Sequence, residues 1–221
     1  MTISGVADGA SFRHSYAPGE VLSIFGSGLA VSAQLAASVP LPSTLGGVAV
    51  TIHGVTAPIY SISPGQLNVQ IPYETPVGPG AALIVSSNGQ TASYSIDIAA
   101  TAPAIFADST GAPMPTSSAR AGDAASLFIT GAGALSPSVA TGAAPADGTA
   151  VASLPKPATQ PVTVIVGGVT ASITFAGVPP GLVGALQINY IVPPGLAPGI
   201  HPVVVTIGNA SSAEGNLTVT P

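Results

Sequence analysis

The chain of 221 residues has no cysteine and no tryptophan, and charged side chains are scarce: three Lys or Arg against eight Asp or Glu. Without cysteine, no disulfide contributes to the fold, and the redox compartment stays open because cytosolic and many surface proteins both lack disulfides. The basic residues Arg13, Arg120 and Lys156 are scattered along the chain. Nucleic-acid binding needs clustered positive charge for phosphate contacts, so this class of function is excluded.

Long apolar runs are also missing, although 47% of the residues are hydrophobic. A membrane-spanning helix needs about 20 consecutive apolar residues, and every run here ends earlier at Gly, Pro, Ser or Thr. We therefore predict no membrane span. The first five residues, Met-Thr-Ile-Ser-Gly, lack the basic and apolar regions of a secretory signal. We expect either a cytoplasmic chain or a segment separated from its signal.

The residues that are abundant favour β-structure. Gly (27 residues) and Pro (23 residues) interrupt helices, whereas the frequent Val, Ile and Thr fit a pleated, half-buried surface. Such Gly and Pro contents also occur in disordered chains. Here, however, the Gly and Pro fall between short alternating runs of Val, Ile and Leu, which is typical of strands and turns.

An internal repeat divides the chain into two similar halves. Four segments recur in the same order: a strand with a Gly-x-Gly turn, a hairpin around Gly-Val-Thr-Ala, a Gln-x-Asn strand stopped by proline, and a closing strand. Six or seven short strands in about 100 residues are typical of an antiparallel sandwich. The matched pairs are 18–29 with 121–133, 46–58 with 162–172, 66–72 with 187–193, and 93–98 with 215–220.

The sequence therefore predicts an all-β protein of two tandem immunoglobulin-like antiparallel β-sandwiches, residues 1–101 and 102–221. The link at 101–106 is short and contains proline, so we expect a semi-rigid relation between the two. Residues 30–44 and 137–156 are predicted to form long loops. The Cys–Trp–Cys core of antibody domains is absent, and the predicted core is instead Phe25, Ile52, Leu67, Val69, Phe128, Ile165, Phe175 and Ile188.

The repeated motifs carry a resemblance. The Gly-Glu-x-Leu-x-Ile-x-Gly-x-Gly-Leu opening from Gly19, the Gly54 hairpin and the Gln66–Pro72 strand resemble the IPT/TIG class of immunoglobulin-like (E-set) domains. Nearly the whole chain resembles an uncharacterised C-terminal module of large extracellular proteins of acidobacteria. The resemblance implies this fold and an extracellular or cell-surface location, and it implies no known activity.

Candidate catalytic residues are few. His14, His53 and His201 lie outside any Gly-x-Ser-x-Gly or His-Glu-x-x-His setting, and His53 and His201 stand beside turns, where exposed polar residues are common. The Gly-x-Gly turns at Gly26 and Gly131 lead from strand to strand, whereas a phosphate loop opens a helix. We therefore predict no enzyme, no catalytic residue and no organic cofactor.

Two weak ligand sites remain as hypotheses. Calcium takes six to eight oxygens, largely from carboxylates; Asp97, Asp108 and Asp123 lie near the junction but form no Asp-x-Asp cluster, and solvated loop acids are the more ordinary interpretation. Tyr73 and Glu74 follow a strand end and are the best candidates for an exposed ligand contact, although a Tyr ring packed over a sandwich end is commoner.

No Asp, Glu, Lys or Arg lies between Lys156 and Glu214, a stretch that includes most strands of the second domain. Sandwiches normally guard their edges with charge, so we expect more apolar surface there, available to another copy, the first domain or other domains of a longer parent protein. Surfaces of Thr and Ser without a partner are the alternative.

We predict a non-enzymatic surface module for adhesion or domain presentation. A carbohydrate- or polymer-binding module and an unrecognised enzyme are the alternatives.

Overall fold

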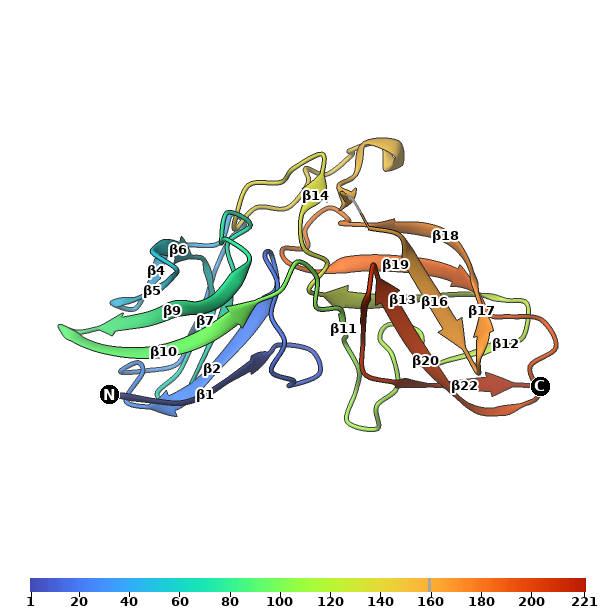
Figure 1. The fold of residues 1–221 in the computed structure, drawn as a ribbon, viewed down its shortest axis with the longest axis horizontal. Coiled ribbons are helices and arrows are strands. Elements are labelled where there is room, and N and C mark those ends of the chain that lie inside the picture. Colours follow the sequence, from blue (N-terminus) through green and yellow to red (C-terminus); the bar gives the residue numbers. More distant parts are fainter. Residues whose placement is uncertain (159) are drawn as a thin grey trace.

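The computed structural model describes residues 1–158 and 160–221, and its regular structure is almost entirely β-strand. Figure 1 shows two bodies side by side along the long axis, with the two chain termini at opposite ends. Each body has its own buried core, one formed by residues between 6 and 98 and one by residues between 105 and 219. One short 3-10 turn, η1 (Val151–Ser153), is the helical element of the described chain.

The first sandwich packs two antiparallel sheets against each other. The β2 sheet has the spatial order β1 (Thr2–Asp8), β2 (Val21–Ser27), β8 (Gln66–Gln70), β7 (Ile59–Ile62) and β3 (Gln34–Leu35). The β9 sheet has the order β10 (Gln90–Ile98), β9 (Gly78–Ser87), β5 (Val48–Ile52) and β4 (Thr44–Leu45), with β6 (Val55–Ala57) also pairing with β5.

The second sandwich repeats this plan. Its β13 sheet has the order β11 (Ala104–Ile105), β13 (Ala124–Thr130), β19 (Leu186–Ile191) and β18 (Ser172–Gly177). Its β20 sheet has the order β12 (Ser118–Arg120), β22 (Gly215–Thr220), β20 (Gly199–Ile207), β16 (Val162–Val166) and β17 (Val169–Thr170), with β21 (Ala210–Ser211) on β20. A separate pair joins β14 (Leu135–Ser136) to β15 (Lys156–Pro157).

The shared topology confirms the all-β prediction of two immunoglobulin-like sandwiches. The predicted hairpins are β5–β6 and β16–β17. Both turn residues of the first hairpin, His53 and Gly54, have positive φ, as do Gly167 and Gly168 in the second. Two consecutive positive φ values give the tight turn whose twist matches that of paired strands.

The two cores are built from aliphatic side chains, and half of the predicted core residues are confirmed. Ile52, Leu67, Val69 and Ile188 are fully buried. Phe25, Phe128, Ile165 and Phe175 are only half-buried, so their assignment to the core was wrong. In runs such as Leu127-Phe128-Ile129, three consecutive apolar residues hide which face of the strand is inside. The inner positions belong to their neighbours Ile24, Leu127, Ile129, Val164 and Val166.

Candidate functional site

The link between the sandwiches is hydrogen-bonded on both sides. Ala99 N donates to Tyr16 O of the first sandwich (2.8 Å), and Ala102 N donates to Gly131 O of the second (2.8 Å). Thr101 Oγ1 donates to Ile207 O (3.1 Å). Gly131 has φ +76°, and a Cβ there would clash with the passing Ala102 carbonyl. This turn glycine is therefore also where the link crosses the second sandwich.

Thr130, the last residue of β13, joins the two bodies directly. Its side chain is 1% exposed. Its Oγ1 accepts a hydrogen bond from Val21 N at the start of β2 (2.8 Å) and donates one to Gly184 O (2.7 Å). One hydroxyl thus satisfies two backbone groups, one from each sandwich, inside the contact.

The loop before β19 forms a second contact. Tyr60 Oη on β7 donates to Val183 O (3.0 Å), and burial raises the pKa of this phenol far above its usual range. Gly184 has φ +63°, and a Cβ there would lie 2.7 Å from Tyr60 Oη and 2.8 Å from Gly19 O. The close approach of the two sandwiches therefore depends on the missing side chain.

The long loop after β14 forms a third contact. Gly142 N donates to Gln70 Oε1 (2.7 Å), and Gly142 O accepts from Leu41 N (2.8 Å). Thr141 Oγ1 accepts from Tyr73 N (3.0 Å) and donates to Glu74 Oε2 (2.6 Å). The segment that the sequence predicts only as a loop thus fixes the second sandwich to the first.

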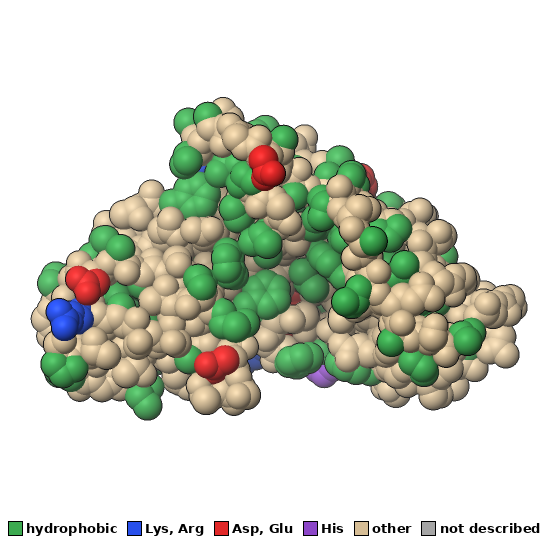
Figure 2. Space-filling view, turned by 180° about the vertical axis from the view of Figure 1, so that it is seen from behind, with side chains coloured by type: hydrophobic (Ala, Val, Ile, Leu, Met, Phe, Trp, Pro, Cys, Tyr) green, Lys and Arg blue, Asp and Glu red, His purple; other side chains and the backbone are tan. Residues whose placement is uncertain are grey.

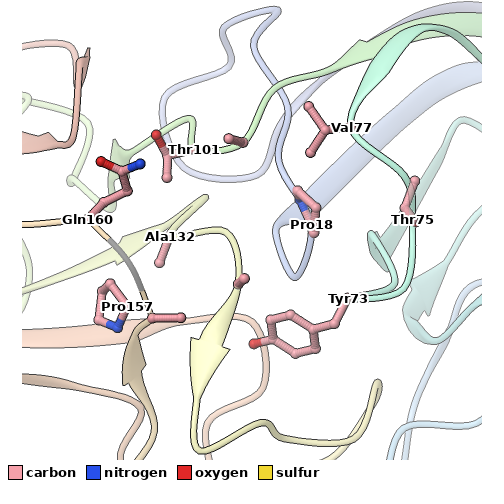
Figure 3. Close-up of a pocket in the computed structure, with 11 residues that line it drawn as sticks. Pro18, Tyr73, Thr75, Val77, Thr101, Ala132, Pro157 and Gln160 are labelled. Atoms are coloured by element: carbon pink, nitrogen blue, oxygen red, sulfur yellow. The ribbon is translucent and has the colours of Figure 1, made fainter.

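A groove of about 220 Å³ lies between the two sandwiches beside these contacts (Figure 3). Tyr73 stands at one side of it, and Pro18 and Val77 also belong to the first sandwich. Thr75 lines the groove, and its buried Oγ1 has no hydrogen-bond partner among the described residues. The opposite wall belongs to the link and the second sandwich and consists of Ala100, Thr101, Ala132, Ala134, Pro157, Ala158 and Gln160.

The predicted contact pair, Tyr73 and Glu74, therefore lies at the junction. The Tyr73 ring covers Gly19, where a Cβ would clash with it, and burial raises the pKa of its phenol well above the usual range. Both residues also line a second hollow of about 430 Å³ next to residues 138–140. Ligand contact by this pair stays a prediction, because their hydrogen bonds in the structure serve the junction.

Two buried acids lie at the junction end of the first sandwich. The Asp8 carboxylate accepts from the backbone N of Ala10 (2.8 Å) and of Arg13 (2.6 Å). Glu20 Oε2 accepts from Ala17 N (2.6 Å), while Oε1 has no partner among the described residues. Burial, reinforced by the charge of Asp8, raises the pKa of Glu20 well above its usual range. Sequence reasoning passed over both acids, although their hydrogen-bond partners, Ala10, Arg13 and Ala17, are close to them in sequence.

The three aspartates proposed for calcium serve separate turns. Asp97 Oδ1 accepts from Gly80 N (2.8 Å). Asp108 Oδ1 accepts from the hydroxyl of Thr110 (2.6 Å), which with nearby backbone donors lowers the pKa of Asp108. Asp123 is exposed in a turn after β12. Within residues 1–158 and 160–221, no group of three or more His, Asp or Glu side chains could hold a metal ion.

The histidines are likewise dispersed. His14 Nδ1 lies 2.7 Å from Val6 O, and His201 Nε2 lies 2.8 Å from Ala197 O. His53 is exposed in its hairpin turn. Each imidazole thus lies beside a backbone carbonyl or in solvent.

Exposed large apolar side chains do not favour the second sandwich, contrary to the inference from its missing charges. Thr, Ser and Gly occupy much of its outer surface. No helix of the described chain reaches the length and apolarity that crossing a bilayer requires. The exposed large apolar residues are Phe12, Val31, Leu35, Val39, Val77, Ile84 and Tyr94 in the first sandwich and Met114, Val151, Val169 and Ile200 in the second.

Comparison with known proteins gives only distant structural likeness. No protein-family model and no curated protein sequence matches the chain. SGBP-B from a complex xyloglucan utilization locus in Bacteroides uniformis is 12% identical, with a TM-score of 0.30 over 98% of this chain and 49% of that one. Tandem Ig domains of titin are 12% identical (TM-score 0.25; 93% and 90% covered). The adhesin InvE of Yersinia pseudotuberculosis is 13% identical (TM-score 0.26; 100% and 58% covered).

The chain spans only part of the longer proteins that it matches. It covers 49% of SGBP-B and 40% of a second protein, whose crystal structure was determined with a xylogluco-oligosaccharide. At these identities and TM-scores the likenesses assign no activity, substrate or partner. The immunoglobulin-like assignment rests on the sheet order described above, which occurs twice.

Proposed function

We propose that this chain is a non-enzymatic module that holds two immunoglobulin-like sandwiches in one fixed relation and presents their surfaces to other proteins or domains outside the cell. The observation that carries the proposal is the junction. Three separate segments of the second sandwich, at Thr130, Thr141–Gly142 and Val183–Gly184, hydrogen-bond to the first. Relative motion is the ordinary expectation for linked domains, and contacts from three separate segments oppose it.

The proposal includes the domain boundary, the kind of domain and the location of the protein. The domains divide between residues 101 and 102, and the motifs resemble IPT/TIG domains and the C-terminal module of extracellular acidobacterial proteins. An extracellular or surface location follows from that resemblance. The dispersed histidines support a role without catalysis, because nucleophilic catalysis needs a base within reach of its nucleophile. Partners are other domains of a longer parent or a second copy.

A distance measurement between the sandwiches tests the proposal. The chain has no native cysteine, so Ser93→Cys on β10 and Ser118→Cys on β12, both exposed positions, attach two spin labels specifically. We expect one narrow distance distribution. A broad distribution, as from a freely moving link, would contradict the fixed relation. Light scattering of the same chain tests self-association separately.

Polysaccharide binding, the first alternative, was predicted with Tyr73 as the contact. Loss of retention on an insoluble polysaccharide after Tyr73→Ala would support that version. A different surface, outside the groove at Tyr73, favours the same ligand class more strongly.

A further inference from the structure

The aromatic side chains of this protein are distributed unusually. None of the five phenylalanines, all of them described, belongs to either buried core. Phenylalanine is normally among the residues most often buried, and here aliphatic side chains fill both cores instead. Phe12 is 61% exposed, and the other four are half-buried: Phe25, Phe128 and Phe175 on strands, and Phe106 just after β11. Rings outside the cores keep part of their surface free for contact.

On the outer face of the β2 sheet, one ring stands beside a row of polar side chains, the first platform. Phe25 pairs across the sheet with Gln66, and Ser23 pairs with Asn68. Gln66 Nε2 and Ser23 Oγ both donate to Asn68 Oδ1 (2.9 Å each), and Asn68 Nδ2 donates to Ser61 Oγ (2.9 Å). The amides and hydroxyls are therefore held in fixed orientation beside the ring.

The outer face of the β13 sheet carries the same chemistry, the second platform. Phe128 pairs with Gln187, and Ser126 pairs with Asn189. Gln187 Nε2 donates to Asn189 Oδ1 (2.7 Å). Phe175 on β18 pairs with Asn189 from the other side, so two rings flank this pair of amides.

Phe25 and Phe128 do not occupy equivalent positions of the sequence repeat. Each nevertheless lies opposite a Gln because the two sheets pair their strands in different registers. Phe25 directly precedes Gly26 of its Gly-x-Gly turn, whereas Phe128 stands three residues before Gly131. The pairing register of β13 on β19 differs correspondingly from that of β2 on β8. Each sandwich nevertheless places a ring opposite the Gln of its Gln-x-Asn strand.

Phe12 extends the first platform. Its ring centroid lies 6.4 Å from that of Phe25, with the planes tilted by 42°, within the usual range of aromatic pairs. Phe12 has φ +59°, which is rare for a bulky residue. The Asp8 carboxylate holds this turn through Ser11 Oγ (2.8 Å) and Arg13 N (2.6 Å). The backbone that carries the exposed ring is thus held by the carboxylate.

The two platforms belong to faces that meet at the junction. Val21 continues the row of Ser23 and Phe25, Thr130 continues the row of Phe128, and the two rows touch where Val21 N donates to Thr130 Oγ1. At about 3.3 Å per residue, Phe25 lies roughly 13 Å and Phe128 roughly 7 Å from this point. One extended chain molecule can therefore reach both rings. Figure 2 shows apolar side chains gathered over the middle of one face and charged ones mainly toward its rim.

Charge restricts the ligand. The strands that carry the platforms contain no Asp, Glu, Lys or Arg; they are residues 21–27, 59–62, 66–70, 124–130, 172–177 and 186–191. Lys156, outside these strands, lines the same hollow as Phe175 at the edge of the second platform. A sugar ring offers an apolar C–H face to an aromatic ring and hydroxyls to the amides beside it, and Asn and Gln both donate and accept. Protein contacts, in contrast, are dominated by Trp, Tyr and Arg anchors, which the platforms lack.

We propose that the two platforms are paired subsites for a neutral polysaccharide, with Phe25 and Phe128 as the ring contacts and Gln66, Asn68, Gln187 and Asn189 as the hydroxyl contacts. The subsites go beyond the presentation role and do not depend on the groove at Tyr73. The fixed junction sets their spacing, so the two act together on one chain molecule.

Affinity electrophoresis of the full chain in gels that contain neutral glucan, xylan, mannan or galactan tests this proposal. We expect retardation in at least one gel. Paired subsites gain at least about 100-fold in avidity, so Phe25→Ala or Phe128→Ala alone lowers the apparent affinity about 100-fold, and the double variant is not retarded. Tyr94→Ala on β10 is the control, because its ring is 37% exposed on the other sheet.

Gln66→Leu and Gln187→Leu test the amides without removing a ring, and we expect each to weaken binding by itself. Circular dichroism checks that every variant folds. No retardation of the wild type, or full retardation of the Phe double variant, overturns the proposal. So does loss of binding with Tyr73→Ala alone, which assigns the ligand to the groove. If the wild type self-associates but binds no polysaccharide, and the Phe variants no longer self-associate, the face is a protein contact and the proposal is overturned. The label distances between the sandwiches stay unchanged in each case, so the proposed function is tested independently.

Discussion

Thr130→Val is the sharpest test of the junction. Valine keeps the β-branched shape of threonine and removes only the hydroxyl. In the wild type this hydroxyl accepts from Val21 N (2.8 Å) and donates to Gly184 O (2.7 Å), and the side chain is 1% exposed. The variant therefore leaves one backbone donor and one backbone acceptor without a partner, while packing changes little.

Each buried polar group that loses its partner costs about 1–3 kcal/mol. Two such groups cost about 2–6 kcal/mol, a large part of the 5–15 kcal/mol typical for a whole domain. Water satisfies both groups when the sandwiches separate, so the penalty falls on the closed junction. We therefore expect Thr130→Val to open the junction before it unfolds either sandwich.

The spin-label pair at positions 93 and 118 measures this opening, and we expect its distance distribution to broaden in Thr130→Val. Thr163→Val is the matched control, because Thr163 is exposed on β16 of the same sandwich. Urea denaturation of both variants accompanies the distance measurement. If Thr130→Val keeps the narrow distribution and the denaturation midpoint of the control, the hydroxyl does not hold the sandwiches together.

Three further predictions concern the same region. Gly184→Ala places a Cβ 2.7 Å from Tyr60 Oη and should lower the denaturation midpoint more than Gly181→Ala, which has a similar positive φ but open space; equal losses would mean that the contact is not tight. Tyr60→Phe removes the bond to Val183 O and should cost about 1 kcal/mol in urea denaturation; an unchanged midpoint contradicts this. The raised pKa of Glu20 makes the folded state hold a proton that the unfolded state releases. Stability should therefore fall as pH rises above the usual glutamate pKa, by at most about 1.4 kcal/mol per pH unit, and Glu20→Gln should remove this slope between pH 4 and 7; an unchanged slope would assign it to another group.

The succession of strands and turns along the chain could be predicted from the sequence because each strand is marked locally, whereas the strand order within each sheet was not predicted. The His53–Gly54 turn and the proline after Gln66–Ile71 identify their strands without reference to the rest of the chain. The side that each strand buries was less accessible, because Phe25 and Phe128 adjoin aliphatic residues that are equally able to enter the core. Only the assembled sheets show that the aliphatic residues are inside.

The junction could not be predicted, because its residues carry no local mark. Thr130 is one of many strand threonines, and Gly184 is one turn glycine among 27 glycines. Their roles arise from the approach of residues more than 100 positions away in sequence, such as Val21 and Tyr60. Tyr73 and Glu74 were identified as noteworthy, and the structure places them at the edge of this contact. The sequence showed only that these two residues follow a strand end, and the structure shows that this strand ends at the junction.

The termini at opposite ends of the long axis (Figure 1) give the junction a mechanical meaning. Tension applied through the two ends must pass from one sandwich to the other across the link at residues 99–103. The bonds of Thr130, Tyr60 and Gln70 lie in parallel with that link, so they share the load until they break together. Pulling a single molecule should therefore give a small extension at low force, as the sandwiches part, before either sandwich unravels.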